Sequence, residues 1–359
     1  MLDYGGDTGP KERRRVPGNC KHPPNVLCTL STITMSKYNA KTSIHELVSD
    51  YTQIIKGKTI LTTGVTPNSL GHIFASAVAA ASPALLILAG RNPAKLQQTA
   101  AAIATAHPGA QTRNLVVDLC SLASVRKAAE EVNAWTDVPS VDVVVNNAGV
   151  MAVDFALTPD GFETQFAASH IGHFLLTNLI MDKILASESP RVVNVSSDGH
   201  RLGPMRWADP HFSNGETYNK WYAYGQAKTA NNLFALSLAD KLSKRGLHAY
   251  SLHPGVIMTT SLGNHVDDGF ESLVTTDRLL GNKEGFQGEF DVVPVEVGTA
   301  THAFAAFDPS ILDQNGAYLI KCRVADPYVD TLKPWATSSI EADKLWELSE
   351  KLVGQEFKY

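Results

Sequence analysis

The sequence predicts a single α/β domain with a doubly wound, mostly parallel sheet and helices on both of its faces. From Lys58 onward, short β-branched runs alternate with helical segments, which is the pattern of parallel strands joined by crossover helices. The strands expected near Leu85 and Val141 are almost wholly apolar, as is typical of strands covered on both faces. Of the 359 residues, 44% are apolar and 19% are charged, so the chain can bury one sizeable core.

The predicted elements alternate along the chain. Strands are expected at residues 59–63, 85–89, 115–117, 141–145, 192–195, 249–252 and 318–320. Helices are expected between and after them at residues 70–81, 93–106, 122–134, 161–186, 218–243 and 295–306. Sheets of this kind bind ligands at the carboxyl ends of their strands, so we look for functional residues in the loops that follow the strands.

Three regions flank or interrupt this core. Residues 1–40 are rich in Gly, Pro, Lys and Arg without apolar periodicity, which predicts a disordered arm ahead of a folded domain at 41–330. Residues 261–294 interrupt the alternation, and we expect either a mobile flap over the site or a plain surface insertion. In the tail, 331–359, leucines recur at helical spacing over 340–352, which predicts a closing helix that docks on the domain.

Composition and charge argue against several classes of function. The net charge of -5 is spread along the chain and gives no basic footprint for nucleic acid. Pro83 divides the longest apolar stretch, 72–90, into an Ala-rich half and a β-like half, which favours helix, turn and strand over a membrane span. The four cysteines lack paired spacing, so we expect no disulfide framework and no metal site. No charged stretch followed by an apolar one opens the chain, and we expect a cytoplasmic protein.

A turn of small residues, Thr63 to Gly71, joins the first strand to the first helix and suits a diphosphate. Glycines such as Gly64 let the backbone come close to a ligand. The amides and dipole at the helix start, near Leu70, favour negative charge. The GxGxxG spacing is not met, so a purely structural turn is the alternative.

The residue after the second strand indicates which dinucleotide is bound. An acidic side chain there would bind the ribose hydroxyls of NAD, whereas Arg91 offers a planar cationic fork for the 2′-phosphate of NADP(H). A solvated surface arginine is the alternative. The position favours NADP(H) as the cofactor.

The strongest pattern is Ser196-Ser197 followed by Tyr224 and Lys228. Tyr224 and Lys228 lie four residues apart and share one helix face, so their polar ends can meet beside a bound ribose. Reduction of a carbonyl needs a proton donor near its oxygen, and oxidation of an alcohol needs a base there. A free tyrosine titrates at about 10. The Lys228 cation, together with oxidised nicotinamide, is predicted to lower the pKa of the phenol, while the Ser197 hydroxyl holds the substrate oxygen.

Seven motifs occur in one order: Thr63-Gly64, Asp118-Leu119, Asn146-Asn147-Ala148-Gly149, His170-Ile171-Gly172-His173-Phe174, Asn194-Val195-Ser196-Ser197, Tyr224 to Lys228, and His253-Pro254-Gly255. Because of these seven motifs, the chain resembles the short-chain dehydrogenase/reductase family, which has a Rossmann-type fold. The retinol-dehydrogenase-like and fungal carbonyl-reductase-like branches are the most similar. The resemblance covers residues 57–325.

The resemblance implies transfer of a hydride between NADP(H) and a carbonyl or secondary alcohol of a small molecule. It implies catalytic roles for Ser197, Tyr224 and Lys228, with Lys228 also binding the nicotinamide ribose. The cofactor site that it implies further includes Gly64, Leu70, Arg91, Asp118, Asn147, Ile257 and Thr259. Among these, Asp118 would contact adenine, and Ile257 and Thr259 would flank the nicotinamide carboxamide. A monomer or a homodimer is compatible with the family.

The region 261–294 is rich in aromatic and aliphatic residues, which suggests a lipophilic substrate. A polyketide, terpenoid or retinoid-like carbonyl of secondary metabolism is our expectation.

Two positions depart from the family pattern. The glycine turn is one residue longer, with Asn68 and Ser69 where a middle glycine is expected. Ser169 occupies the position of an asparagine that anchors a water for proton relay. The shorter serine predicts either an altered proton supply or a different backbone contact.

Two other clusters invite different chemistry. His170 and His173 lie three residues apart on a predicted helix and suit a metal, but no third ligand accompanies them, so core packing is the favoured interpretation. Asp198 and His200 beside Ser197 resemble a hydrolase triad, but no GxSxG turn surrounds that serine.

Two rival functions share the fold. The first is a nucleotide-binding regulatory protein with weak or no catalysis, for which Ser169 and the altered turn are the hints. The second is an epimerase or dehydratase, which also uses the YxxxK pattern. Arg91 and Asn147 argue against the second, since such enzymes favour NAD and lack the Asn-Asn-Ala-Gly strand end.

Overall fold

The described part of the chain begins slightly ahead of the predicted domain. The computed structural model describes residues 37–268, 270–288 and 290–359, so positions 1–36 of the predicted arm lie outside the described residues. Lys37 Nζ lies 2.7 Å from Asp50 Oδ2. Residues 37–359 form one compact unit.

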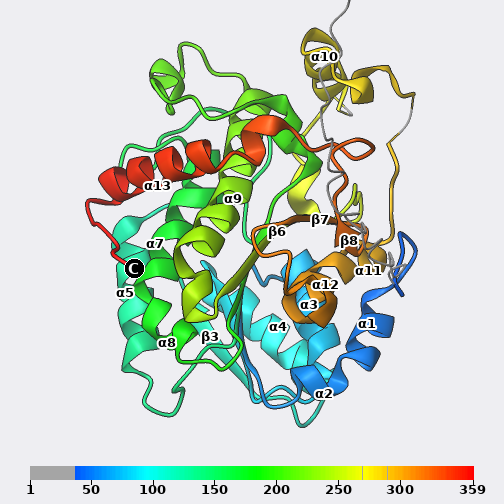
Figure 1. The fold of residues 1–359 in the computed structure, drawn as a ribbon, viewed down its shortest axis with the longest axis vertical. Helices are drawn as coiled ribbons and strands as arrows, with labels where there is room; N and C mark the ends of the chain where they lie inside the picture. Colours follow the sequence, from blue (N-terminus) through cyan, green and yellow to red (C-terminus); the bar gives the residue numbers. More distant parts are fainter. Residues whose placement is uncertain (1–36, 269, 289) are drawn as a thin grey trace, which may run out of the picture. The chain divides into compact units, whose positions relative to one another are not determined.

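The sheet has eight strands within the described residues, in the order β3-β2-β1-β4-β5-β6-β7-β8 (Figure 1). All neighbours pair in parallel except β7 and β8. The strands are β1 (Thr59–Thr63), β2 (Leu85–Gly90), β3 (Thr112–Val116), β4 (Val143–Asn146), β5 (Arg191–Val195), β6 (His248–His253), β7 (Tyr318–Ile320) and β8 (Arg323–Val324). The seven predicted strands are confirmed with shifts of a few residues at their ends. The two-residue β8 is too short for a periodic pattern to predict.

Helices cover both faces of the sheet, as predicted. They are α1 (Ile44–Asp50), α2 (Thr52–Ile55), α3 (Leu70–Ala79), α4 (Pro93–Ala106), α5 (Leu122–Ala134), α6 (Thr164–Phe166), α7 (Gly172–Leu179), α8 (Met181–Leu185), α9 (Lys220–Leu242), α10 (Glu271–Leu279), α11 (Val295–Gly298), α12 (Ala300–Phe307) and α13 (Ser339–Val353). In Figure 1, α5, α7, α9 and α13 lie towards the left of the view and α1, α3 and α12 towards the right. One apolar core includes residues of α5, α7, α9 and α13, and the other includes residues of α1, α3, α4 and α12. Strand β4 supplies Val144 to the first core and Val143 and Val145 to the second, which explains its continuous apolar run.

Local signals in the sequence explain where several helices begin. Asn92 caps α4 by accepting a hydrogen bond from Lys95 N at 3.1 Å, and Pro93 takes the first helical position. The helix predicted at 340–352 is present as α13, and its buried Trp346 packs edge-on against Phe174 of α7 with ring centroids 5.0 Å apart. The stretch 72–90 is a helix, a turn and a strand. No helix of the described residues is long and apolar enough to span a membrane.

The single helix predicted at 161–186 is wrong. The segment consists of α6, a π-helix at Ala167–Ile171 (η1), α7 and α8. Most of it is buried, so apolar residues occur on every side and no periodic pattern marks the breaks. Gly172, which follows the π-helix, packs tightly on the loop after β3. A Cβ at this position would collide with the Leu119 carbonyl oxygen.

The helical segments that were not predicted include α1 and the helices of residues 261–294. Ser43 and Glu46 form a capping box at the start of α1, a signal present in the sequence. The segment predicted as a flap or insertion contains α10 and a 3₁₀ helix at Lys283–Phe286 (η6).

Candidate active site

Loops at the carboxyl ends of β1, β4, β5 and β6 line two adjoining cavities. The first, which we call the tyrosine cavity, has a volume of about 230 Å³, and the second, the glycine-loop cavity, about 530 Å³. The linings share Leu70, Asn147, Gly149, Val150, Met151, Thr260 and Leu262. A ligand can therefore extend from one cavity into the other.

The turn after β1 allows a ligand to approach the backbone closely. Gly64 has a φ of +72°, and a Cβ there would lie 2.8 Å from Ala148 Cα, so only glycine fits. Asn68 takes a φ of +64°, a left-handed conformation that asparagine adopts more readily than most residues. The longer turn thus forms without a middle glycine. Ser69 caps α3, which begins at Leu70 with its amides and dipole beside the glycine-loop cavity.

Two cations lie on the wall of the glycine-loop cavity. Arg91 follows β2 and is exposed, and Lys95 lies four residues later on α4. Asp118, after β3, and Asn147, after β4, also line this cavity. Asn147 Nδ2 donates a hydrogen bond to Thr63 O at 2.8 Å and so ties β4 to β1. The cation pair suits a phosphate group.

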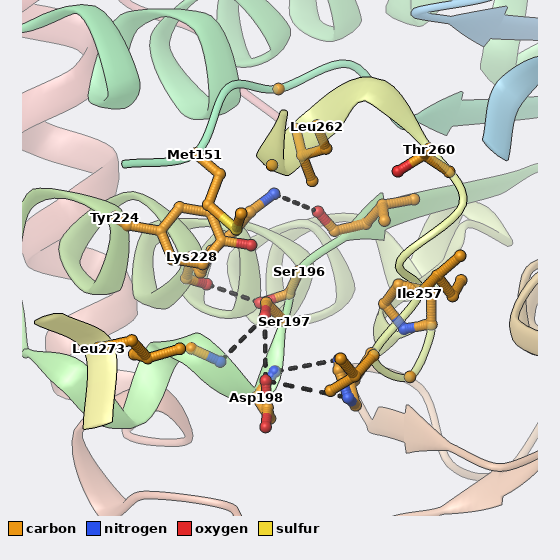
Figure 2. Close-up of a pocket in the computed structure, with 18 of the residues that line it drawn as sticks. Met151, Ser196, Ser197, Asp198, Tyr224, Lys228, Ile257, Thr260, Leu262 and Leu273 are labelled. Carbon is orange, nitrogen blue, oxygen red and sulfur yellow. Dashed lines mark hydrogen bonds and ion pairs between the residues drawn. The ribbon is translucent and has the colours of Figure 1, made fainter. Parts of the chain in front are cut away.

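Ser197, Tyr224 and Lys228 all line the tyrosine cavity (Figure 2). Ser197 follows β5, whereas Tyr224 and Lys228 lie about one turn apart on α9. Lys228 Nζ lies 5.6 Å from the centroid of the Tyr224 ring and donates a hydrogen bond to Val195 O at 3.0 Å. The Ser197 hydroxyl donates to Asp198 Oδ1 at 3.2 Å. The structure therefore brings the three predicted catalytic side chains to one cavity.

The pKa values of these groups are governed mainly by burial. The pKa of Tyr224 is raised to about 12, mainly by burial; the hydrogen bond with Ser197 opposes this rise and the charge of Asp198 adds to it. Burial lowers the pKa of Lys228 to about 8. The lowering predicted for Lys228 together with oxidised nicotinamide stays a prediction; in the protein side chains alone the phenol pKa is raised, because removing the phenolate from water outweighs the attraction of Arg201.

Asp198 stays acidic next to Ser197. Burial acts to raise the pKa of its carboxyl, but His253 and Arg201 together bring that pKa below its ordinary value. Asp198 Oδ2 lies 2.8 Å from Arg201 Nη1. A carboxylate is thus held beside the hydroxyl of Ser197.

The walls of the tyrosine cavity are largely apolar (Figure 2). They are formed by Leu70, Val150, Met151, Leu202, Trp221, Leu262, Phe270, Leu273 and Phe290. The polar lining groups include Ser197, Tyr224 and Lys228, together with Asn147, Thr260 and Asn264, so the cavity suits a largely apolar molecule with a reacting oxygen.

The loop after β6 places Ile257 and Thr260 on the cavity wall. Ile257 lines the tyrosine cavity and packs so closely on α11 that a Cβ on Gly298 would lie 2.3 Å from Ile257 Cδ1. Thr259, expected beside the cofactor, is exposed, and Thr260 lines both cavities in its place. The turn of the backbone after Ile257 decides which threonine faces inward, and the sequence motif does not specify it.

Ser169 lies on the lysine side of the site. Its Oγ is buried and has no hydrogen-bond partner among the residues that the structure describes. A Cβ on Gly149 would lie 3.2 Å from Ser169 Oγ and 3.4 Å from Lys228 Nζ, so both groups face the backbone at Gly149. The hydroxyl is therefore placed to bind a small polar molecule near the lysine.

The two neighbouring histidines are packing residues, as predicted. His170 Nε2 lies 2.7 Å from Ser349 Oγ, and His173 Nε2 lies 2.8 Å from Thr63 Oγ1. Burial lowers their pKa values to about 3 and about 4. Across residues 37–359, leaving out 269 and 289, no three potential metal ligands come together.

The suspected hydrolase triad is not assembled. His200 Nδ1 bonds to the carbonyl oxygen of Ser197 at 2.7 Å, and His200 Nε2 accepts a hydrogen bond from Lys333 N at 3.2 Å. The His200 imidazole therefore bonds to the backbone of Ser197 and Lys333, whereas the Ser197 hydroxyl bonds to Asp198.

Sequence reasoning missed Lys95, Trp221 and Arg201 as residues of the two cavities. Lys95 could have been found, because it follows Arg91 by four residues where a helix begins. Trp221 and Arg201 carry no local signal, since their roles depend on a segment more than 50 residues away.

Comparison with known proteins assigns the chain to a family. The short chain dehydrogenase family profile matches residues 58–209. Retinol dehydrogenase 14 of Mus musculus is 33% identical over 311 residues, which cover 84% of this chain and 87% of the mouse protein. A short-chain dehydrogenase/reductase of Penicillium rubens, prx1, is 36% identical over 249 residues, covering 67% of this chain and 69% of the fungal protein.

A solved structure of similar fold comes from Mycobacterium paratuberculosis. That protein, of uncharacterised function, has a TM-score of 0.62 and 29% identity, over 85% of this chain and 96% of its own. The chain therefore belongs to the short-chain dehydrogenase/reductase family, an oxidoreductase family that uses nicotinamide cofactors on alcohol and carbonyl groups.

Proposed function

We propose that the protein transfers a hydride between NADP(H) and a carbonyl or secondary alcohol of a small lipophilic molecule. The observation that carries this proposal is the meeting of Tyr224, Ser197 and Lys228 at the apolar tyrosine cavity, which adjoins a second cavity with two cations. Every residue given a role lies within the predicted domain at 41–330.

The residues fit a dinucleotide. A Cβ on Gly64 or on Gly71 would lie 2.8 Å from atoms of Ala148 or Asn147, so glycine lets the turn pack on the loop after β4. The turn residues Gly64, Ser69 and Leu70 line the glycine-loop cavity, where a diphosphate would lie. Gly64 and Leu70 would hold the diphosphate, and Asp118 and Asn147 would line the adenosine and ribose portions. Arg91 and Lys95 would bind a 2′-phosphate, which is the basis for preferring NADP(H) to NAD.

The protein residues then divide the chemistry among them. When bound, the cofactor supplies or accepts the hydride. Tyr224 gives a proton to the carbonyl oxygen in reduction and removes one from the hydroxyl in oxidation. Ser197 holds that oxygen in place, and Ile257 and Thr260, which line the cavity, would contact the nicotinamide.

Lys228 would bind the nicotinamide ribose and hold its ammonium beside the phenol. Since burial raises the pKa of Tyr224 to about 12, the phenol is protonated at neutral pH, which suits reduction. For oxidation, the positive charge of the oxidised nicotinamide would favour the phenolate. We therefore propose reduction as the physiological direction.

The substrate class follows from the cavity wall. Aromatic and aliphatic side chains form most of the wall around Ser197 and Tyr224, so a substrate with an extended apolar body and a carbonyl is favoured. The mouse relative's name refers to retinol, which is a molecule of this kind. We propose a polyketide-, terpenoid- or retinoid-like carbonyl.

The test is NADPH oxidation with a panel of lipophilic ketones, aldehydes and quinones. We expect Tyr224→Phe to abolish turnover and to keep NADPH affinity. The matched control is Tyr222→Phe on the same helix, which should retain wild-type rates. Wild-type rates in Tyr224→Phe would refute the assignment. Binding of NADPH without consumption by any carbonyl would instead support the regulatory alternative.

A further inference from the structure

A buried arginine joins the loop of Ser197 to the segment over the tyrosine cavity. We call residues 270–288, which contain α10 and η6, the covering segment. Arg201 lies in the 3₁₀ helix Asp198–Leu202 (η2), and its side chain is 3% exposed. Its Nε and Nη2 donate to Asp277 Oδ1 and Oδ2 at 2.9 and 2.7 Å. The two residues are 76 positions apart and form a bidentate pair.

The Arg201 guanidinium also contacts Asp198, the residue that follows Ser197. Arg201 Nη1 lies 2.8 Å from Asp198 Oδ2, and the Ser197 hydroxyl donates to Asp198 Oδ1 at 3.2 Å. Unbroken polar contacts thus run from Asp277 through Arg201 and Asp198 to Ser197. Asp277 is 1% exposed, so water does not substitute for the guanidinium at that end.

The covering segment, which carries Asp277, also faces the tyrosine cavity, where a substrate would lie. Phe270 and Leu273 of the covering segment line the tyrosine cavity. Trp221 Nε1 donates to Ser272 Oγ at 2.8 Å, and Trp221 lies one turn before Tyr224. Asn282 Nδ2 donates to Asp277 Oδ1 at 2.9 Å and so fixes the carboxylate within the segment. An apolar molecule pressing on Phe270 and Leu273 therefore acts on the element that carries Asp277.

We propose that Arg201 is a positioning residue that couples the seating of the covering segment to the alignment of the Ser197 hydroxyl. The inference rests on the proposed function, because alignment of Ser197 matters only if that hydroxyl holds a reacting oxygen. A planar guanidinium holds Asp277 and Asp198 together only when α10 is seated against η2. A substrate that fills the tyrosine cavity stabilises the position of α10 against η2. The Ser197 hydroxyl is therefore aligned with the reacting oxygen when the cavity is filled.

The charges around Arg201 explain why a lysine would not replace it. Three carboxylates approach the side chain, those of Asp277, Asp198 and, at 3.7 Å from Nε, Glu284. A lysine retains one positive charge but offers a single nitrogen, which cannot make the paired contacts to Asp277 and still reach Asp198. Arg201→Lys is therefore a conservative change in charge and a disruptive one in geometry.

The test compares Asp277→Asn, Arg201→Lys and wild type. Asp277→Asn changes the covering segment alone, keeps the size of the side chain and leaves one oxygen that can accept a hydrogen bond from Arg201. We expect both variants to lower kcat for a carbonyl substrate by roughly tenfold to a hundredfold, since small misplacements of a reacting group have such effects. The dissociation constant for NADPH should stay within about twofold, because no atom of the glycine-loop cavity changes.

A readout without catalysis distinguishes this inference from the proposed function. In Asp277→Asn, hydrogen exchange should rise both in residues 270–288 and in residues 198–202, the loop of Ser197. If the wild type consumes no NADPH, the proposed function fails, while faster exchange in 198–202 still supports the coupling. Unchanged exchange in 198–202 overturns it whether or not the enzyme is active.

The matched control is Arg113→Gln, which breaks an exposed bidentate pair with Asp137 at 2.6 and 3.2 Å. It should leave kcat and the exchange of 198–202 unchanged. A second result that would overturn the inference is a rise in exchange of 270–288 with kcat preserved, because Arg201 would then only stabilise the covering segment. The inference would also be overturned if Arg113→Gln lowered kcat as much as Arg201→Lys does.

Discussion

Replacing Lys228 with methionine should stabilise the protein at neutral pH although it removes activity. Lys228 is 5% exposed, and burial lowers the pKa of its ammonium from 10.5 to about 8. Keeping the charged form buried therefore costs about 3 kcal/mol, at about 1.4 kcal/mol for each tenfold change in the ionisation constant. The variant loses the bond to Val195 O, worth about 1.5 kcal/mol. Val195 O keeps its bond from Asn231 Nδ2 at 2.9 Å, so no acceptor is left unpaired.

The net gain is about 1–2 kcal/mol at pH 7, and its pH dependence has a defined sign. The pKa of Lys228 is lower in the folded state than in the unfolded state, so the folded state binds fewer protons between pH 8 and 10.5. Wild-type stability therefore rises with pH across that window. The advantage of Lys228→Met is complete below about pH 8 and shrinks towards pH 10.5.

The assay is urea unfolding followed by circular dichroism at pH 7 and pH 10. The control is Lys344→Met, whose native side chain is 52% exposed and which should change the free energy of unfolding by less than about 0.5 kcal/mol. The reasoning is refuted if Lys228→Met is less stable than wild type at pH 7. A difference that does not vary with pH would equally show that the buried charge is not its cause.

Three further substitutions probe the two cavities. Arg91→Glu should reduce the preference for NADPH over NADH by roughly 10- to 100-fold, because it removes one charge-assisted bond of about 1.5–3 kcal/mol, measured by fluorescence titration of both nucleotides. Ser169→Ala should not lower the free energy of unfolding, since the buried hydroxyl has no partner among the described residues, and urea unfolding measures this. Gly199→Ala should lower kcat by roughly a hundredfold in the NADPH assay, because the new Cβ would lie 2.6 Å from Tyr224 Cε1 and 3.2 Å from Ser197 Oγ.

Each of these predictions has a result that contradicts it. An unchanged ratio of NADPH to NADH affinity would remove Arg91 from the cofactor site. A loss of more than about 1 kcal/mol in Ser169→Ala would mean that the hydroxyl makes a bond in the protein. Wild-type kcat in Gly199→Ala would mean that the Tyr224 ring can move aside without cost.

Local chemistry in the sequence determined the framework of this protein. Asn92 and Pro93 start α4, and the apolar run of β4 reflects two covered faces, so both elements were predictable from neighbouring residues. The spacing of Tyr224 and Lys228 placed them on one helix face. Arg91 was predicted as a cofactor residue from its place after β2, and it lines the glycine-loop cavity.

Only the tertiary structure decided the electrostatics and the walls of the site. Burial, which sums contributions from many distant residues, raises the pKa of Tyr224 in the protein side chains alone, which the local pattern did not predict. The choice of Thr260 over Thr259 depends on a loop path between elements, and the contact of Arg201 with Asp277 spans 76 positions. Hydrophobic periodicity and capping act over a few residues along the chain, so they specify elements. Solvent exclusion and long-range pairing act between elements, and these exist only once the chain has folded.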